Sequence, residues 1–149
     1  MYKNILMPTD GSVLSQKAVE HGVALAQTLN AEITFVAVTT PFHSVSGEPQ
    51  MVANMPDSFK DFVHDYLASD AASALSQAQA VATDAGVQCD TICIERDHIY
   101  QGIIDTAADR GSDLILMASH GHRGLVGVIL GSETQKVLAH STIPVLVYR

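Results

Sequence analysis

A chain of 149 residues is the size of a single domain, and folding at this length buries about two-thirds of the unfolded surface. With 47% hydrophobic and 16% charged residues, the composition predicts a packed globular fold and not a disordered chain. The formal net charge of −8 argues against general nucleic-acid binding and against adsorption to an anionic membrane, since both need a basic surface. No apolar run approaches the roughly 20 residues of a membrane span, and the first residues do not resemble a signal peptide, so a cytoplasmic protein is expected.

The first part of the chain reads as strand, helix, strand and loop. The apolar run Tyr2–Met7 predicts a strand, and the punctuation residues of Pro8–Ser12 predict a turn after it. Apolar residues at helical spacing predict an amphipathic helix over Val13–Leu29, with Asn30 as its stop. Nearly every residue of Ile33–Val38 is apolar or β-branched, as in a strand buried on both faces. Thr39–Asp57 carries several prolines and is expected to be an irregular surface loop.

The second part continues the same alternation. Segments with apolar residues at helical spacing alternate with apolar, strand-like runs, and Gly86 and Gly111 are predicted to end helices. The expected elements are a helix 58–85, a strand 87–95, a short helix 99–108, a strand 113–118, a helix 132–140 and a strand 143–147. Regular alternation of strands and helices predicts one doubly wound α/β domain with a five-stranded parallel sheet and helices on both faces.

The two cysteines are expected to be free thiols. Cys89 and Cys93 lie four residues apart in a predicted strand, so their side chains share one face about 13 Å apart at ~3.3 Å per residue. A disulfide needs Cα atoms within roughly 7 Å, and the spacing matches no zinc signature.

The stretch from Leu114 to Lys136 predicts an anion site. A buried strand is followed by a loop containing Gly121, Gly124 and Gly127, and then by a helix start. A glycine-rich turn before a helix lets main-chain N–H groups and the positive end of the helix dipole face an anion. Ser132 and Gln135 have the spacing of a capping box, which places the helix start at Ser132. The hydroxyls of Ser132 and Thr134 would lie in the first turn, where a phosphate would sit.

A second loop is expected at the same edge. In doubly wound sheets ligands bind at the carboxyl ends of the strands, where the strand order reverses. If the first and fourth strands are central neighbours, Pro8–Ser12 and the loop 118–130 face one crevice. Asp10 is then either a ligand-binding carboxylate or simply a helix cap. His120, His122 and Arg123 are either ordinary loop residues or a cationic mouth, with Arg123 as the phosphate clamp.

These motifs together resemble the universal stress protein family. The resemblance covers the whole chain and rests on Pro8-Thr9-Asp10-Gly11-Ser12, on Ala118-Ser119-His120-Gly121, on Gly131-Ser132 nine residues later, and on Ile143-Pro144-Val145-Leu146-Val147. It implies the strand order 3-2-1-4-5 and a homodimer formed by pairing of the last strands, 143–147. For members with the glycine motif it implies binding of ATP, or of AMP or ADP, with a divalent metal. The histidines of this chain do not have metal-ligand spacing on a predicted helix, so Mg²⁺ or Mn²⁺ is expected to be held mainly by the phosphates and not by protein side chains.

The resemblance also implies a set of nucleotide-binding residues. Pro8, Thr9 and Asp10 would border the adenine and ribose, with the Asp10 carboxylate toward the sugar hydroxyls, and Val38 and Met117 would line the adenine pocket. The end of the fourth strand and the start of the next helix would contact the sugar and phosphates, through Ala118, Gly121, Gly131, Ser132, Glu133 and Thr134.

Ala118 departs from the family pattern, which has a glycine there. If that backbone needs a positive φ, alanine costs roughly 1–2 kcal/mol, and if it needs close approach, the methyl group crowds the ribose. Charge-assisted phosphate contacts contribute about 1.5–3 kcal/mol each, so binding is expected to survive in a weaker form.

Three functions follow as hypotheses. The first is a homodimeric stress-response or regulatory module that binds ATP or AMP. The second is a slow ATPase or nucleotide-dependent transferase, which needs a general base such as His120, His122 or Glu133. The third is a dimeric interaction module without nucleotide, its site vestigial because of Ala118.

Overall fold

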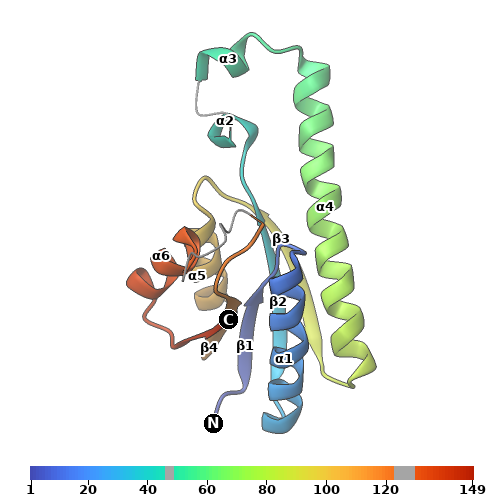
Figure 1. Cartoon of the computed structure of the whole chain (residues 1–149), viewed down its shortest axis with the longest axis vertical. Coiled ribbons are helices and arrows are strands. Elements are labelled where there is room, and N and C mark those ends of the chain that lie inside the picture. Colours follow the sequence, from blue (N-terminus) through green and yellow to red (C-terminus); the bar gives the residue numbers. More distant parts are fainter. Residues whose placement is uncertain (46–48, 123–129) are drawn as a thin grey trace.

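The computed structural model describes residues 1–45, 49–122 and 130–149. Its centre is a parallel five-stranded sheet in the order β3-β2-β1-β4-β5, with helices on both faces (Figure 1). The strands are β1 Asn4–Pro8, β2 Glu32–Thr39, β3 Cys89–Glu95, β4 Leu114–Ala118 and β5 Val145–Tyr148. The predicted fold class and strand order are therefore confirmed.

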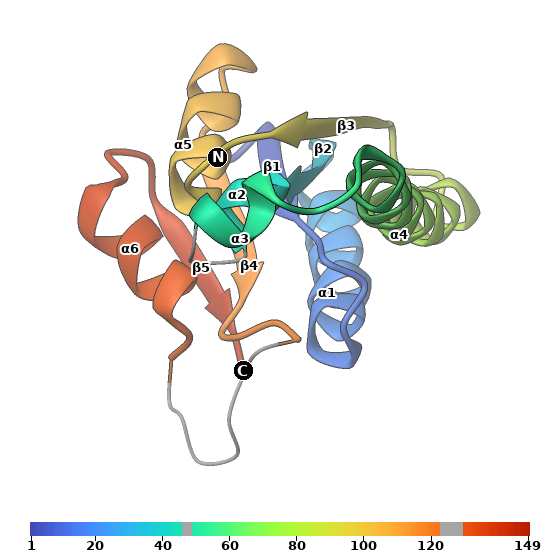
Figure 2. The same cartoon turned by 90° about the horizontal axis from the view of Figure 1, so that it is seen from above.

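Two pairs of helices cover the sheet, as the view from above shows (Figure 2). The helices are α1 Val13–Leu29, α2 Phe42–Val45, α3 Pro49–Ala53, α4 Asp57–Asp84, α5 Ile99–Asp109 and α6 Ser132–His140. α1 and α4 pack on one face, and α5 and α6 on the other. No helix within the described ranges is both long and apolar enough to cross a bilayer.

Each central strand contributes to two cores, because successive strand residues point to opposite faces. Ile5 and Met7 of β1 belong to the core under α1 and α4, whereas Leu6 between them belongs to the core under α5 and α6. The Met7 side chain lies against the Cα of Gly22 in α1, where a Cβ would overlap its Cε and Sδ atoms. A glycine at position 22 therefore lets α1 approach the sheet closely.

The helix stops predicted from sequence are confirmed. α1 ends at Asn30, which has a left-handed backbone (φ 51°) and donates its N–H to the carbonyls of Ala26 and Gln27. Gly86 and Gly111 follow α4 and α5 with φ values of +70° and +63°. Glycine adopts this conformation without the Cβ penalty that other residues incur.

The prediction of an irregular loop over Thr39–Asp57 is wrong, because the segment contains α2 and α3. Its prolines do not oppose helix formation: Pro41 lies just before α2 and Pro49 is the first residue of α3. A first-turn N–H has no intrahelical acceptor, so proline loses nothing there. Residues 46–48 lie outside the described ranges.

Candidate functional site

The turn after β1 is built by hydroxyl and carboxylate side chains that bind its main chain. The buried Thr9 donates its main-chain N–H to the Val36 carbonyl (2.9 Å), and its hydroxyl lies 2.9 Å from the Ser15 hydroxyl. Ser12 is the N-cap of α1 and accepts the N–H of Ser15 through its side chain. The reading of Asp10 as the cap of α1 is therefore wrong.

Asp10 instead joins the two loops. Its Oδ1 accepts the N–H of Ser12 at 3.0 Å, and its Oδ2 accepts the N–H of His122 at 3.0 Å. The His122 ring donates from Nε2 to the Asp10 main-chain carbonyl at 2.8 Å. Gly121 allows this contact, because a Cβ there would overlap Oδ2 of Asp10. The predicted meeting of the two loops at the carboxyl ends of β1 and β4 is thus observed in the described part of each loop.

The end of β4 is tied directly to the start of α6. Ser119, which is buried, donates its N–H to the Tyr148 carbonyl, and its own carbonyl accepts the N–H of Gly131; both distances are 2.7 Å. The Thr134 hydroxyl donates to the Ala118 carbonyl at 3.1 Å. Because this bond uses the hydroxyl proton of Thr134, that proton is not available to a phosphate at the same time. Thr134 therefore positions the first turn of α6 on the sheet.

The predicted capping box at the start of α6 is wrong. Gly131 is the N-cap, with an extended backbone, and Ser132 is the first helical residue. Gln135 donates its side-chain amide to the Leu130 carbonyl at 2.9 Å instead of bonding to the cap residue. Within the described residues no acceptor meets the main-chain N–H groups of Ser132, Glu133 and Thr134. The Ser132 hydroxyl is exposed beside them, and unpaired N–H groups at a helix start attract anions.

The Glu133 side chain turns away from these free donors. Its Oε2 accepts the N–H of Tyr100 in the first turn of α5 at 2.9 Å, and its Oε1 accepts from the Lys136 ammonium at 3.1 Å. A carboxylate at the start of α5 compensates an unpaired N–H and interacts favourably with the helix dipole. The Glu133 side chain therefore links α6 to α5, and only the main-chain N–H of Glu133 belongs to the unpaired donors at the start of α6.

Ala118 has an ordinary strand backbone. Among the described non-glycine residues only Asn30 has a positive φ, so alanine at the end of β4 is not strained. Met117 is buried, and the half-buried Val38 packs against the same core beneath α5 and α6. Val38 and Met117 are the penultimate residues of β2 and β4. Arg123, Gly124 and Gly127 lie outside the described residues.

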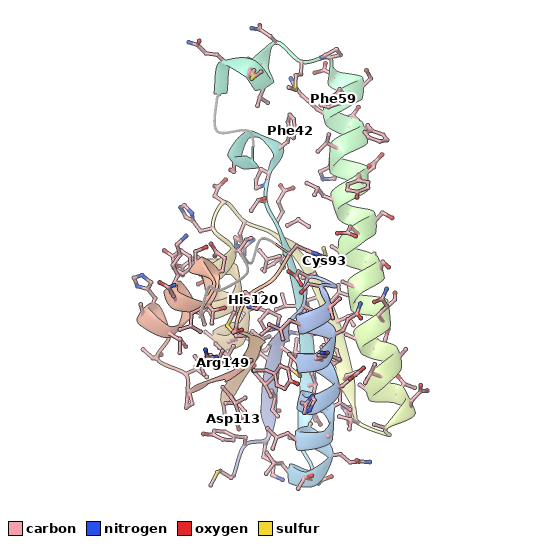
Figure 3. All side chains as sticks on the ribbon, viewed as in Figure 1. Phe42, Phe59, Cys93, Asp113, His120 and Arg149 are labelled. Carbon is pink, nitrogen blue, oxygen red and sulfur yellow. The ribbon has the colours of Figure 1, made fainter. Side chains whose placement is uncertain are left out.

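A cavity of 290 Å³ opens between the first turns of α1 and the loop after β4. Its lining includes Ser12, Lys17, His120 and Gly121, and His120 is marked in Figure 3. Lys17 is not among the residues predicted for the site. The sequence could have indicated Lys17, because it lies one turn into the helix that follows the Pro8–Ser12 loop.

The cysteines lie on the edge strand β3 and are free thiols as predicted; Cys93 is labelled in Figure 3. Burial raises the pKa of the Cys93 thiol. Burial, with a smaller contribution from the Asp90 carboxylate, also raises the pKa of Cys89. Neither thiol has the lowered pKa typical of a reactive cysteine.

Comparison with known proteins gives one consistent family. The model of the universal stress protein family matches residues 1–149. Universal stress protein YxiE of Bacillus subtilis is 30% identical over 149 residues, which cover the whole of both chains. The solved structure of universal stress protein UspA from Lactobacillus plantarum is 30% identical, with a TM-score of 0.81 over 99% of this chain and 98% of that one.

Two more distant structures share the fold and were solved with nucleotides. A universal stress protein in complex with cAMP is 19% identical, with a TM-score of 0.68 over 99% of this chain and 96% of that one. A universal stress protein from Archaeoglobus fulgidus in complex with dAMP is 16% identical, with a TM-score of 0.69 over 99% of this chain and 98% of that one.

Proposed function

Because the chain belongs to the universal stress protein family, we propose that it binds an adenine nucleotide, with ATP preferred to AMP, and acts as a homodimeric regulatory module in the cytoplasm. One observation carries the proposal: the first three N–H groups of α6 lack acceptors within the described chain, beside the exposed Ser132 hydroxyl. Such a helix end favours phosphate through both its hydrogen-bond donors and its dipole. The two solved family members with bound cAMP and dAMP support an adenine nucleotide as the ligand.

In this proposal the two loops have different roles. Gly131, Ser132 and the N–H groups of Glu133 and Thr134 bind the phosphates. Pro8, Thr9 and Asp10 border the ribose and base at the end of β1, with Val38 and Met117 below the base. Arg123 remains the proposed clamp on the phosphates.

The divalent ion in this proposal is held by the nucleotide. Within the described residues no group of three His, Cys, Asp or Glu side chains could hold a metal. Mg²⁺ commonly keeps several waters and binds through substrate phosphates, so Mg²⁺ or Mn²⁺ can enter with ATP without a site built from protein side chains.

The dimer in this proposal forms at β5, the last strand of the sheet. β5 pairs with β4 on one side only, and Leu146 is 41% exposed. An exposed apolar edge strand favours pairing with another chain. A second copy bound along 143–147 would cover this edge.

Binding is tested by titrating nucleotide-free protein with ATP, AMP and GTP in Mg²⁺, using calorimetry and thermal unfolding. At a ligand concentration of about 100 Kd, ATP should stabilise the protein by about 2.7 kcal/mol, which raises the Tm by roughly 5–10 °C for a domain of this size. GTP should give a much smaller shift. Equal shifts with ATP and GTP, or none with ATP, would overturn the proposal.

A pair of serine variants localises the phosphates. Ser132→Ala should weaken ATP binding about tenfold, as expected for loss of one hydrogen bond to a charged group. Ser58→Ala is the matched control, since Ser58 is also an exposed serine in the first turn of a helix, α4. Unchanged ATP affinity in Ser132→Ala would contradict the assignment of the phosphates to α6.

The described contacts do not favour an ATPase. All three candidate bases have partners: the His122 ring bonds to the Asp10 carbonyl, the His120 ring to the Ser119 hydroxyl, and Glu133 to the N–H of Tyr100. The ordinary backbone at Ala118 also removes the strain argument for a vestigial site. Binding and signalling without turnover is the function that this geometry supports best.

A further inference from the structure

The N-terminal half of α4 extends beyond the sheet (Figure 1). α4 has 28 residues, and its buried residues all lie between Ala71 and Ala82. The turns from Asp57 to Asp70 contribute no buried residue to either core, although they begin the longest helix of the fold. Packing on the sheet therefore accounts for only the second half of α4.

The projecting half carries an exposed aromatic stripe. Phe59, Phe62 and Tyr66 are 46%, 66% and 63% exposed. Their spacing of three and then four residues places them on one side of the helix, at the a and d positions of a heptad repeat. Phe59 also contacts Phe42 of α2 edge-to-face, with ring centroids 6.1 Å apart (Figure 3). A cluster of this kind, unlike scattered apolar residues, is typical of an interaction surface.

The stripe is short. The next a and d positions of the same register are Ser69 and Ser73, so the apolar seam ends after Tyr66. Val63 and Leu67 beside the stripe are half-buried and extend the apolar area toward the rest of the molecule. A surface of this length suits a helix of a few turns laid along α4, bound through its own a and d residues.

An acidic side chain flanks the stripe on one side and another lies just beyond its end, whereas Val63 occupies the e position beside Phe62. In the register set by Phe59 and Phe62, Asp65 occupies a g position and Asp70 the following e position, and both are exposed. Residues 57–70 contain four aspartates and one lysine, a formal net charge of −3. Lys60 is 3.5 Å from Asp57 and the His64 ring is 3.7 Å from the exposed Asp65, whereas no ion pair forms at Asp61 or Asp70 within the described residues. Positions e and g set partner choice in paired helices, so these carboxylates select basic side chains.

The same charges disfavour a second copy of this chain. In a parallel pair of α4 helices the g residue Asp65 would face the e residue Asp70 of the other copy. In an antiparallel pair with overlapping stripes g faces g, which again brings Asp65 against Asp65 of the other copy, whereas Val63 faces Val63 at e. An anionic lipid surface is repelled for the same reason. We propose that the face formed by Phe59, Phe62 and Tyr66 binds a short basic amphipathic helix of a partner protein.

The test uses two synthetic helical peptides that differ only in charge. Both have leucine at a and d; one has lysine at e and g, and its twin has glutamate. Binding of each labelled peptide to the full chain is measured by fluorescence anisotropy in low salt. The lysine peptide should bind at least about tenfold more tightly than the glutamate peptide, a difference of about 1.4 kcal/mol. Equal affinities, or no binding of the lysine peptide, would overturn the proposal.

Surface variants assign the binding face. The double variant Phe62→Ser, Tyr66→Ser should lose at least tenfold in affinity for the lysine peptide, whereas Leu138→Ser, at a side chain 43% exposed on α6, should lose none. Asp65→Lys with Asp70→Lys should transfer the preference to the glutamate peptide. The control Asp84→Lys, at the opposite end of α4, should not. All these positions are exposed, and thermal unfolding confirms that each variant folds.

Two further measurements exclude the other occupants. Sedimentation velocity over a range of concentrations should give the same oligomeric state for wild type and for the Phe62→Ser, Tyr66→Ser variant. Vesicles of phosphatidylcholine with phosphatidylglycerol should bind neither protein. Self-association or vesicle binding that disappears in the variant would replace the proposed partner helix with a second copy or a membrane.

Discussion

Ala118→Gly tests most directly whether the backbone at position 118 needs the glycine that the family resemblance implies. The family resemblance implies a glycine here, yet Ala118 ends β4 with no positive φ and with a half-buried side chain. Glycine in a strand costs about 0.5–1 kcal/mol relative to alanine. Loss of a half-buried methyl group adds roughly 0.4 kcal/mol, half of the ~0.8 kcal/mol for a fully buried one. The variant should therefore be less stable by about 1–1.5 kcal/mol.

Thermal unfolding of nucleotide-free protein measures this loss. For a domain of about 150 residues each kcal/mol corresponds to about 2–4 °C, so the Tm should fall by roughly 2–6 °C. Ala37→Gly calibrates the measurement, because Ala37 lies in β2 with 3% exposure and loses a fully buried methyl group. Its Tm should fall further than that of Ala118→Gly when both are measured at one protein concentration.

The same variant tests whether the methyl group of Ala118 crowds the ribose. The Ala118 carbonyl, which accepts the Thr134 hydroxyl, is unchanged by the substitution, so ATP affinity should change less than about threefold, under ~0.7 kcal/mol. ATP binding more than about tenfold tighter in the variant would mean that the methyl group occupies ligand space. A higher Tm without nucleotide would mean that the backbone at position 118 does prefer glycine. Either result refutes the reasoning.

Two other predictions follow from contacts outside the crevice. Glu133→Ala should lower the free energy of unfolding by about 1 kcal/mol in urea, because the N–H of Tyr100 loses its acceptor at the start of α5, whereas Glu20→Ala at an exposed site on α1 should change it by less than about 0.5 kcal/mol. Equal losses would contradict this role of Glu133. In the Cys89→Ser variant, Cys93 should react with iodoacetamide more slowly than glutathione at pH 7.5. Burial raises the pKa of the Cys93 thiol, which lowers its thiolate fraction at any given pH, so its rate should rise only at a higher pH than that of glutathione. A rate at pH 7.5 equal to that of glutathione would disagree with this.

The sequence predicted the sheet because its signals are local. β1 and β4 read as apolar runs, and α1 and α6 begin and end where the sequence placed them. Hydrophobic spacing and stop residues such as Asn30 act within a few positions of the chain, so they can be read without knowledge of the fold. The loop 39–57 was missed because its prolines were taken as breakers and not as helix-starting residues.

The site could be predicted only to the level of its loops. Asp10 and His122 are 112 residues apart in sequence, and Tyr100 and Glu133 are 33 apart. No local pattern specifies such partners, so a side chain expected to face the ligand can instead hold two elements together. The Glu133 carboxylate is one example. The capping box failed for a smaller reason, since Gly131 and not Ser132 has the extended backbone of an N-cap.

The distribution of hydrogen bonds decides where nucleotide affinity should reside. At the β1 loop both Asp10 carboxylate oxygens already accept main-chain N–H groups, so a ribose hydroxyl would share an acceptor that is partly used. At α6 the first three main-chain N–H groups have no acceptor within the described chain. A bound anion would supply their first acceptor. New charge-assisted bonds stabilise a complex more than shared ones. Affinity should therefore increase from AMP to ADP to ATP, and a site in which AMP binds as tightly as ATP would place the main contacts at Asp10 instead.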